Sequence, residues 1–236
     1  MKMFNVKRLI GALVACGLTM AVTAAPAHAG FVLSLTDGLT TVVVPDNSGG
    51  DSFSAADVIQ YSNATFDAFW SIVVNTGIHD VSTGTVQPQL HLSVTATSLG
   101  DTTGRDLYVS LTDTGFTTDP AVHTLQMGGT TIGKVSAFDY RDNGNSEFGG
   151  SQLNSIGPLG AGSYNGTATS ALFSGAPVPY SVTLSGLFHH GRSGTSSGDF
   201  DLSTSQVPEP ASLSLLGLGL VGLAARTRRR LQGKKQ

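Results

Sequence analysis

The chain is poor in cysteine, in charge and in helical periodicity. Of its 236 residues only one is a cysteine, Cys16, and 12% are charged. A single cysteine excludes an intramolecular disulfide and any metal site built from several thiolates. Apolar residues at helical spacing are missing from the central part, where only residues 54–57 suggest a helical turn. We therefore expect a fold that depends on an apolar core between strands.

The few charges are unevenly distributed. Between Gly30 and Gln206 there are four basic and fifteen acidic residues, a formal net charge of −11, although the whole chain carries only −3. Nucleic acids and anionic membrane surfaces are bound by basic faces, so this composition excludes both as partners of the central part. It suits a soluble exported protein, including one that meets divalent cations.

The first 29 residues have the three parts of a secretory signal peptide. The positive start contains three basic residues: Lys2, Lys7 and Arg8. A mostly apolar run follows at residues 9–25, and Ala27 and Ala29 flank one residue in a small-x-small cleavage site. We expect removal of residues 1–29 and a mature chain that begins at Gly30. A lipoprotein signal with Cys16 as the lipidated residue is the alternative, although it leaves a very short apolar stretch.

Residues 207–236 combine three features in a fixed order. A proline-containing motif comes first: Val207, Pro208, Glu209 and Pro210. The uncharged, leucine-rich residues 211–225 follow and are expected to form a membrane helix, although a full span takes about 20 residues. A basic cluster comes last: Arg226, Arg228, Arg229 and Arg230. Arginines stay on the cytoplasmic side of a membrane, so the preceding body is left on the far side.

This tail closely resembles the PEP-CTERM sorting signal, whose substrates are cut near the Pro-Glu-Pro by the membrane protease exosortase. The two prolines cannot sit in a helix interior, which keeps the segment extended and open to a protease. The resemblance implies export through the inner membrane and a precursor held transiently by residues 211–225. It also implies release at the cell surface or into an extracellular biofilm matrix, with exosortase and an exopolysaccharide as partners. The alternative is an ordinary tail anchor with a proline-rich stalk.

Residues 30–206 show the alternation of apolar and polar residues that is typical of strands. Leu90, Leu92 and Val94, for example, alternate with polar residues, and a period of two directs one set toward a core. Strands are expected at residues 31–35, 39–44, 58–61, 68–74, 90–95, 107–112, 134–140, 167–173 and 180–185. Many short strands without crossover helices predict one all-β domain, a β-sandwich or jelly roll.

Residues that favour turns separate these strands. Turns are expected at Asp37-Gly38, residues 47–50, Gly100-Asp101, Asn143-Gly144 and Asn165-Gly166. Two stretches rich in glycine, residues 149–163 and 191–198, are expected to be surface loops.

No candidate catalytic motif has the context that its chemistry needs. Residues 194–198 match Gly-x-Ser-x-Gly, but a nucleophile elbow requires an apolar strand before it and a helix after it, so a flexible loop is predicted. His189 and His190 are neighbours on an expected strand and would point to opposite faces, which indicates polar residues at a strand end. The body is therefore predicted not to be an enzyme, and a secreted hydrolase is the least favoured alternative.

Calcium is the only cofactor that the sequence brings into question. Asp46 and Asp51 lie in one glycine-containing turn, and Asp139 and Asp142 flank another that also contains Asn143, Asn145 and Glu147. Carboxylate and amide oxygens are the ligands that calcium prefers. Neither turn has EF-hand spacing, and Asp and Asn are also ordinary turn formers. The prediction is no cofactor, with calcium as the alternative.

Trp70 and Tyr61 are the aromatic residues considered for sugar stacking. Trp70 shares one strand face with Ile72 and Val74, which favours a place in the core. The preferred interpretation is an exported structural or adhesion protein of the cell surface or exopolysaccharide matrix. A β-sandwich module that binds calcium or a glycan is the alternative.

Overall fold

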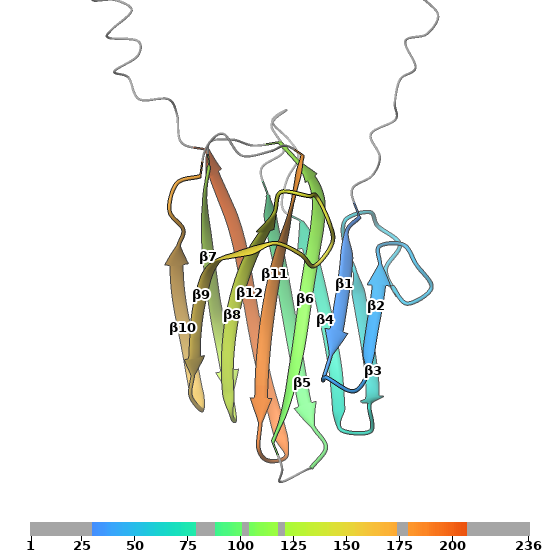
Figure 1. Cartoon of the computed structure of the whole chain (residues 1–236). Helices are drawn as coiled ribbons and strands as arrows, with labels where there is room; N and C mark the ends of the chain where they lie inside the picture. Colours follow the sequence, from blue (N-terminus) through green and yellow to red (C-terminus); the bar gives the residue numbers. More distant parts are fainter. Residues whose placement is uncertain (1–29, 79–87, 101–103, 118–120, 174–178, 207–236) are drawn as a thin grey trace, which may run out of the picture.

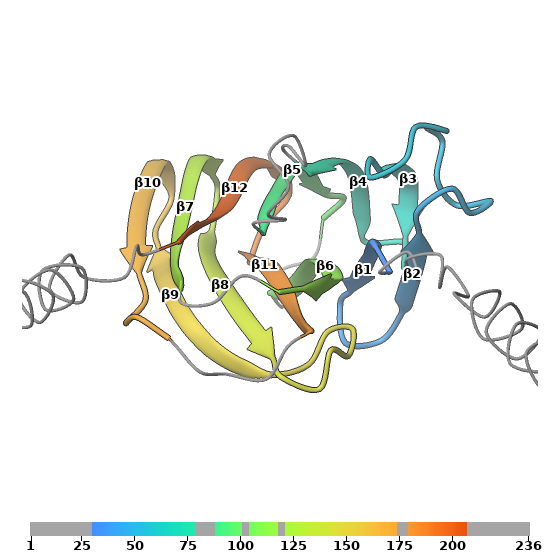
Figure 2. The same ribbon diagram turned by 90° about the horizontal axis from the view of Figure 1, so that it is seen from above.

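The computed structural model describes residues 30–78, 88–100, 104–117, 121–173 and 179–206. They form two six-stranded sheets that pack face to face (Figures 1 and 2). Sheet A contains, in order, β2 (Thr41–Pro45), β1 (Val32–Thr36), β6 (Arg105–Phe116), β11 (Tyr180–His190), β8 (Lys134–Asp142) and β9 (Ser151–Leu159). Sheet B contains β10 (Gly162–Thr169), β7 (Ala121–Thr131), β12 (Gly194–Gln206), β5 (Gln89–Ser98), β4 (Trp70–Ile78) and β3 (Gln60–Phe66). The prediction of an all-β sandwich is confirmed.

The chain passes back and forth between the two sheets. Every pairing between described strands is antiparallel, and most neighbours within a sheet are distant in sequence. The connections from β2 to β3 and from β9 to β10 join the sheets at their two lateral edges. The start of β1 and the end of β12 lie at the same end of the sandwich (Figure 1). The predicted signal peptide and sorting tail therefore adjoin the same end of the body.

The core follows the predicted alternation. Leu92 and Val94 on β5 are 0% and 1% exposed, whereas Ser93 points to the outer face. Trp70 is fully buried and packs at 5.0 Å against Phe69 in an edge-on arrangement. Inward-facing residues of both sheets form one apolar cluster. Burial of this cluster is the main stabilising contribution, because apolar surface removed from water contributes about 25 cal/mol per Å².

One buried polar pair interrupts the core between the sheets. His123 of β7 and Asp139 of β8 are both fully buried, with Nδ1 and Oδ2 2.8 Å apart. Arg141, two residues further along β8, lies over the ring of Tyr180 at 4.0 Å. No strand was predicted over β7, because the polar His123 occupies an inward position and interrupts the alternation there.

Both stretches predicted to be loops contain strands. β9 and the start of β10 lie within residues 149–163, and β12 begins inside residues 191–198. Asn165-Gly166, predicted as a turn, lies within β10. A Cβ atom on Gly166 would lie 2.5 Å from the Ile156 side chain, and one on Gly198 2.6 Å from the Tyr164 hydroxyl. These glycines therefore serve close packing near the sheet edge and do not reverse the chain.

Three other local predictions need correction. β3 runs from Gln60 to Phe66 and not over residues 58–61, and β10 ends at Thr169, before much of the predicted strand at residues 167–173. The region of residues 54–57 forms a turn, where Asp57 has a positive φ of 63°. Within the described ranges no helix is long and apolar enough to cross a membrane. The signal peptide at residues 1–29 and the predicted helix at 211–225 lie outside these ranges.

Candidate functional site

The outer face of sheet A carries rows of side chains that cross its strands. Residues at paired positions of antiparallel strands project from the same face of a sheet. Three rows cross β1, β6, β11 and β8: Val32, Thr112, Thr183 and Tyr140; Ser34, Ser110, Ser185 and Phe138; Thr36, Tyr108, Leu187 and Ser136. Hydroxyl groups dominate these rows, and aromatic rings stand among them.

A hollow of about 360 Å³ lies on this face, and we call it the aromatic hollow. Three aromatic rings line it, those of Tyr108, Tyr140 and Phe148. Its other lining residues are Ser34, Thr36, Ser110, Thr183, Ser185, Gly149 and Gly150. None of the described residues that line it is charged. The hollow therefore combines apolar faces with many neutral hydrogen-bonding groups.

The loop between β8 and β9, residues 143–150, forms one wall of the aromatic hollow. It crosses the outer face over β11 and β6 (Figures 1 and 2). Asp142 accepts bonds from the amides of Gly144 at 3.0 Å and Ser146 at 2.9 Å. These amides favour the charged carboxylate and hold the pKa of Asp142 below its ordinary value. Asn145 Oδ1 accepts a further bond, at 2.7 Å, from the amide of Gly115 on β6. The wall is thus fixed at both its base and its tip.

The phenol and hydroxyl groups of the aromatic hollow lie close to one another. Tyr108 is 40% exposed, and Phe148 is 37% exposed. Burial, and then the neighbouring Tyr108, raise the pKa of Tyr140, so the Tyr140 phenol stays protonated near neutral pH. Ser110 Oγ and Ser185 Oγ are 2.7 Å apart. Two hydroxyls bonded to each other in this way can still donate one hydrogen bond and accept others from a ligand.

A second hollow, of about 310 Å³, lies toward the other end of the same face. Its lining residues are Asp106, Lys134, Ser136, Pro158, Leu187 and His189. His189 Nδ1 lies 2.7 Å from Asp106 Oδ1, and both side chains are nearly half exposed. We call it the histidine hollow.

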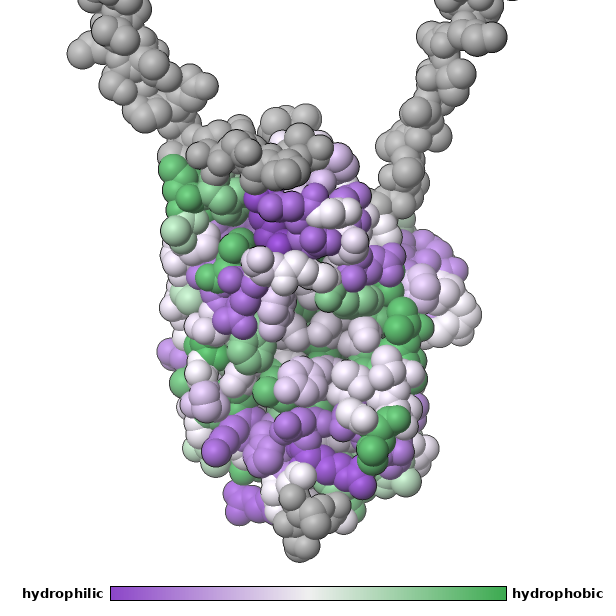
Figure 3. Space-filling model, in the orientation of Figure 1, coloured by the Kyte–Doolittle hydropathy of each residue, from purple (hydrophilic) through white to green (hydrophobic). Residues whose placement is uncertain are grey.

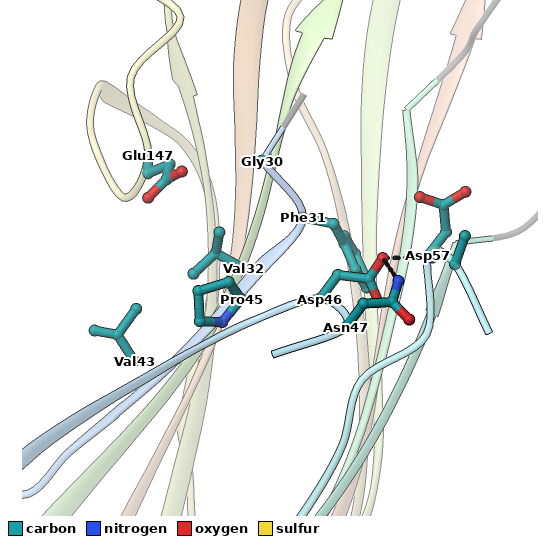
Figure 4. Close-up of a pocket in the computed structure, with 10 residues that line it drawn as sticks. Gly30, Phe31, Val32, Val43, Pro45, Asp46, Asn47, Asp57 and Glu147 are labelled. Atoms are coloured by element: carbon teal, nitrogen blue, oxygen red, sulfur yellow. Dashed lines mark hydrogen bonds between the residues drawn. The ribbon is translucent and has the colours of Figure 1, made fainter. Parts of the chain in front are cut away.

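A third hollow, of about 480 Å³, lies where the chain enters β1 and is acidic (Figure 4). Asp46, Asn47 and Asp57 stand on one side of it and Glu147 on the other (Figure 4). Asp46 Oδ2 accepts bonds from the Asn47 side chain at 2.9 Å and from the Asp57 amide at 3.0 Å. The carboxylates here are therefore partly used to hold the loop between β2 and β3.

The pKa of the buried carboxyl of Asp113 on β6 is affected by a charge in this acidic hollow, that of Asp57. Asp113 is 7% exposed. Burial, together with the nearby charge of Asp57, raises its pKa to about 7, although a bond from the Thr114 amide opposes this shift. A carboxyl with such a pKa is only partly ionised at neutral pH.

The structure separates the calcium candidates. Asp51 accepts bonds from the amides of Asn47, Phe53 and Gln60, at 2.9 to 3.1 Å, and so organises the same loop as Asp46. Asp139 faces the core, whereas Asp142 faces outward and caps its own loop. The second predicted set is thus divided between two faces of β8. Across the described ranges no group of three or more His, Cys, Asp or Glu side chains is placed to hold a metal ion. The prediction of no cofactor, with calcium as the alternative, stays a prediction.

The Gly-x-Ser-x-Gly stretch is a strand and not the flexible loop that the sequence predicted. Its central Ser196 lies on β12, fully buried, with Oγ 2.6 Å from His190 Nε2 and 3.0 Å from Thr131 Oγ1. Burial, followed by the neighbouring His189, lowers the pKa of His190 to about 4. A serine and a histidine are therefore adjacent, but both are sealed in the core.

The two histidines point to opposite faces, as predicted. His189 lies outside with Asp106, while His190 packs inside against Trp70 at 4.9 Å. His190 is thus a core residue and only His189 is the polar strand-end residue that was expected. The core placement of Trp70 is confirmed, and Tyr61 is 8% exposed. The sequence analysis missed the exposed Tyr108 and the half-buried Tyr140 as a pair, although both occupy outward positions in the strand alternation.

Comparison with solved structures adds little to this description. One similar structure is of "TmCBM61 in complex with beta-1,4-galactotriose", at 11% identity and a TM-score of 0.31, covering 61% of this chain and 92% of that chain. A similarity of this size carries no argument about function, and the fold assignment depends on the two sheets themselves. No curated protein matches the chain.

The tail gives a specific family match. Residues 206–230 match the family model described as the PEP-CTERM protein-sorting motif. The match begins at the last residue of β12 and includes both the Pro-Glu-Pro motif and the arginine cluster. The resemblance predicted from the sequence is confirmed. The chain therefore carries a PEP-CTERM sorting motif, which implies export by way of a membrane-anchored precursor and processing by exosortase.

Proposed function

We propose that the mature body is a non-enzymatic protein of the cell surface or biofilm matrix that binds exopolysaccharide through the aromatic hollow. The observation that carries the proposal is the grouping of Tyr108, Tyr140 and Phe148 with five serine or threonine side chains on one sheet face. Ligand sites typically combine aromatic walls with a small number of placed polar groups.

A sugar chain has the matching chemistry. One face of a pyranose ring presents C–H groups, which pack on an aromatic ring, and its edge carries hydroxyls. Tyrosine suits such a ligand because it offers an apolar face and a polar end. Hydroxyl pairs such as Ser110 and Ser185 can donate to and accept from those sugar hydroxyls.

Three features support a role without catalysis. The serine of the Gly-x-Ser-x-Gly stretch is fully buried, so a substrate carbonyl has no path to it. The phenol of Tyr140 has a raised pKa, which disfavours a role as a base near neutral pH. The described lining of the aromatic hollow contains no carboxylate or imidazole, the groups that most often act as general acids and bases.

The strand that leads into the sorting motif and the aromatic hollow belong to different sheets. The motif begins at the end of β12, a strand of sheet B, whereas the hollow is on the outer face of sheet A. This arrangement supports a surface protein that is held or released by its tail and contacts polysaccharide with the opposite sheet.

Polysaccharide binding is tested with residues 30–206, which contain both sheets and their shared core. Affinity electrophoresis in gels with neutral polysaccharides, and with the exopolysaccharide purified from the host, should show retardation. A double variant, Tyr108→Ala with Tyr140→Ala, should abolish it while circular dichroism stays unchanged. Phe53→Ala removes an exposed aromatic ring from the loop between β2 and β3 and is the control. Retardation that survives the double variant, or none in any gel, would refute the proposal.

The delivery route is tested on the full chain in its host. The intact mass of the surface form should correspond to a chain that starts at Gly30 and lacks the arginine cluster. Replacement of Pro208, Glu209 and Pro210 by alanine should keep the protein in the membrane fraction, because exosortase then has no motif to cut. A surface form that still ends in Gln236 would contradict the route.

A further inference from the structure

We propose that the aromatic hollow and the histidine hollow are two ends of one trough, which takes the interior of an unbranched neutral polysaccharide laid along the strands. This inference rests on the proposed function and adds the shape, charge and length of the ligand. Figure 3 shows the face concerned, with weakly polar residues across its middle and hydrophilic residues gathered toward its upper and lower ends.

The strand register joins the two hollows. Tyr108 lines the aromatic hollow, and its partner Leu187 lines the histidine hollow. Leu187 also pairs with Ser136, a second lining residue of the histidine hollow. A single row of side chains therefore belongs to both hollows, and no intervening strand or loop among the described residues separates them.

The length of the trough follows from the same strands. Thr183 lies in the aromatic hollow and His189 in the histidine hollow, both on β11. Six residues of strand advance by about 20 Å, at 3.2–3.4 Å per residue. A distance of this size is several sugar rings long, so one ring cannot occupy both hollows. A chain that runs parallel to β11 can.

The two ends differ in chemistry, which gives the trough a direction. The aromatic end has no charged residue among its described lining and offers stacking faces. The other end offers an imidazole and a carboxylate 2.7 Å apart, with Lys134 beside them on β8. Such groups can bind neutral hydroxyls, because a carboxylate accepts hydrogen bonds and an ammonium donates them. The ligand is neutral because the body carries −11, which repels acidic polysaccharides.

The test measures how affinity depends on chain length. Titration calorimetry of residues 30–206 with unbranched β-1,4-linked oligosaccharides of glucose and of galactose, from disaccharide to hexasaccharide, should show affinity rising along the preferred series. His189→Ala should weaken hexasaccharide binding about three- to tenfold, the effect of losing one hydrogen bond, and leave disaccharide binding unchanged. An acidic polysaccharide, alginate, should not bind.

Sheet B offers a matched control variant. His91 and Asp201 form an equivalent exposed pair there, with Nδ1 and Oδ1 also 2.7 Å apart. His91→Ala should leave binding of every oligosaccharide unchanged. If the hexasaccharide binds no more tightly than the disaccharide, or His189→Ala behaves like His91→Ala, the trough is wrong. If oligosaccharides bind in that way and the binding still requires Tyr108, the proposed function survives. When no oligosaccharide or polysaccharide binds at all, both proposals fall.

Discussion

The outer faces of sheets A and B are built from similar residues but differ in shelter and in aromatic content. Both carry hydroxyl pairs between neighbouring strands: Ser110 with Ser185 at 2.7 Å on sheet A, and Thr97 with Thr195 at 2.8 Å on sheet B. Among the described residues, a long loop that crosses the outer face, residues 143–150, is found on sheet A alone, where it and the strands bring aromatic rings together. A hydroxyl-rich face is therefore a general product of outward strand positions in this chain.

One hollow on the outer face of sheet B lacks such a wall and can be compared with the aromatic hollow. It measures about 380 Å³ and includes Asp199, Asp201, Gln126 and Asn165 among its lining residues. Its described lining is polar and acidic, with no aromatic ring. Hydroxyls and amides on an open sheet are well hydrated, so a sugar gains little by replacing the water. We infer that ring faces and a wall distinguish a binding face from an ordinary polar face.

The largest expected effect comes from a buried charge that should unfold the body, and with it the outer faces of both sheets. Lysine at Val94 would be buried unpaired between the sheets, which costs several kcal/mol and should unfold the body. Lysine at Ser93 projects from the outer face of sheet B and should change the free energy of unfolding very little. Thermal melts followed by circular dichroism measure both. Equal tolerance of lysine at the two positions would contradict the division into inner and outer faces.

A second effect concerns Asp113 on sheet A and depends on pH. Its folded pKa of about 7 exceeds the ordinary value of 3.8, so the folded state binds this proton more tightly than the unfolded state. The stabilisation is present below about pH 4 and is lost as the pH rises through 7. Asp113→Asn should therefore gain stability relative to the natural protein over that range, by up to a few kcal/mol.

Urea unfolding of both proteins between pH 4 and 8 measures this difference. The depressed pKa of His190 works in the opposite direction, since its stabilisation is lost as the pH falls from 6.5 toward 4. That contribution is common to both proteins and cancels in the comparison. Asp199→Asn, on the exposed face of sheet B, controls for the loss of one negative charge. If the difference in free energy of unfolding between Asp113→Asn and the natural protein does not change with pH, burial does not raise the pKa of Asp113.

A smaller effect is expected when the wall of the aromatic hollow is loosened, which should leave the outer face of sheet A as open as that of sheet B. Asp142→Ala removes the carboxylate that accepts bonds from the amides of Gly144 and Ser146 and so holds the loop of residues 143–150 at its base. The wall should loosen, and polysaccharide affinity should fall several-fold while the melting temperature drops by a few degrees. Asp201→Ala on sheet B should leave the affinity unchanged. Full affinity in Asp142→Ala would mean that the aromatic rings suffice without the wall.

The smallest expected effect is that of calcium. Three backbone amides already occupy the oxygens of Asp51, and two occupy those of Asp142. Millimolar calcium should therefore raise the melting temperature no more than magnesium does. A ligand that binds only the native state stabilises it by mass action, so a rise specific to calcium would reveal a site and overturn this prediction.

The sequence by itself determined the features that depend on neighbouring residues. The sorting motif is contiguous at residues 206–230, and a linear pattern is sufficient to identify it. Alternation is equally local, because a strand turns successive side chains to opposite faces. Leu92, Val94 and Trp70 could therefore be assigned to the core, and His189 and His190 to opposite faces, before any strand was paired.

Tertiary structure decided whatever depends on which strands become neighbours. Tyr108 and Tyr140 share a hollow only because β11 lies between β6 and β8 in register, and the strand order is not contained in any one strand. The same applies to Ser196 and His190, whose contact places a motif serine in the core. Glycine misled the prediction for a related reason: Gly166 is needed for close approach to Ile156, and only the packed sheets distinguish that need from a turn.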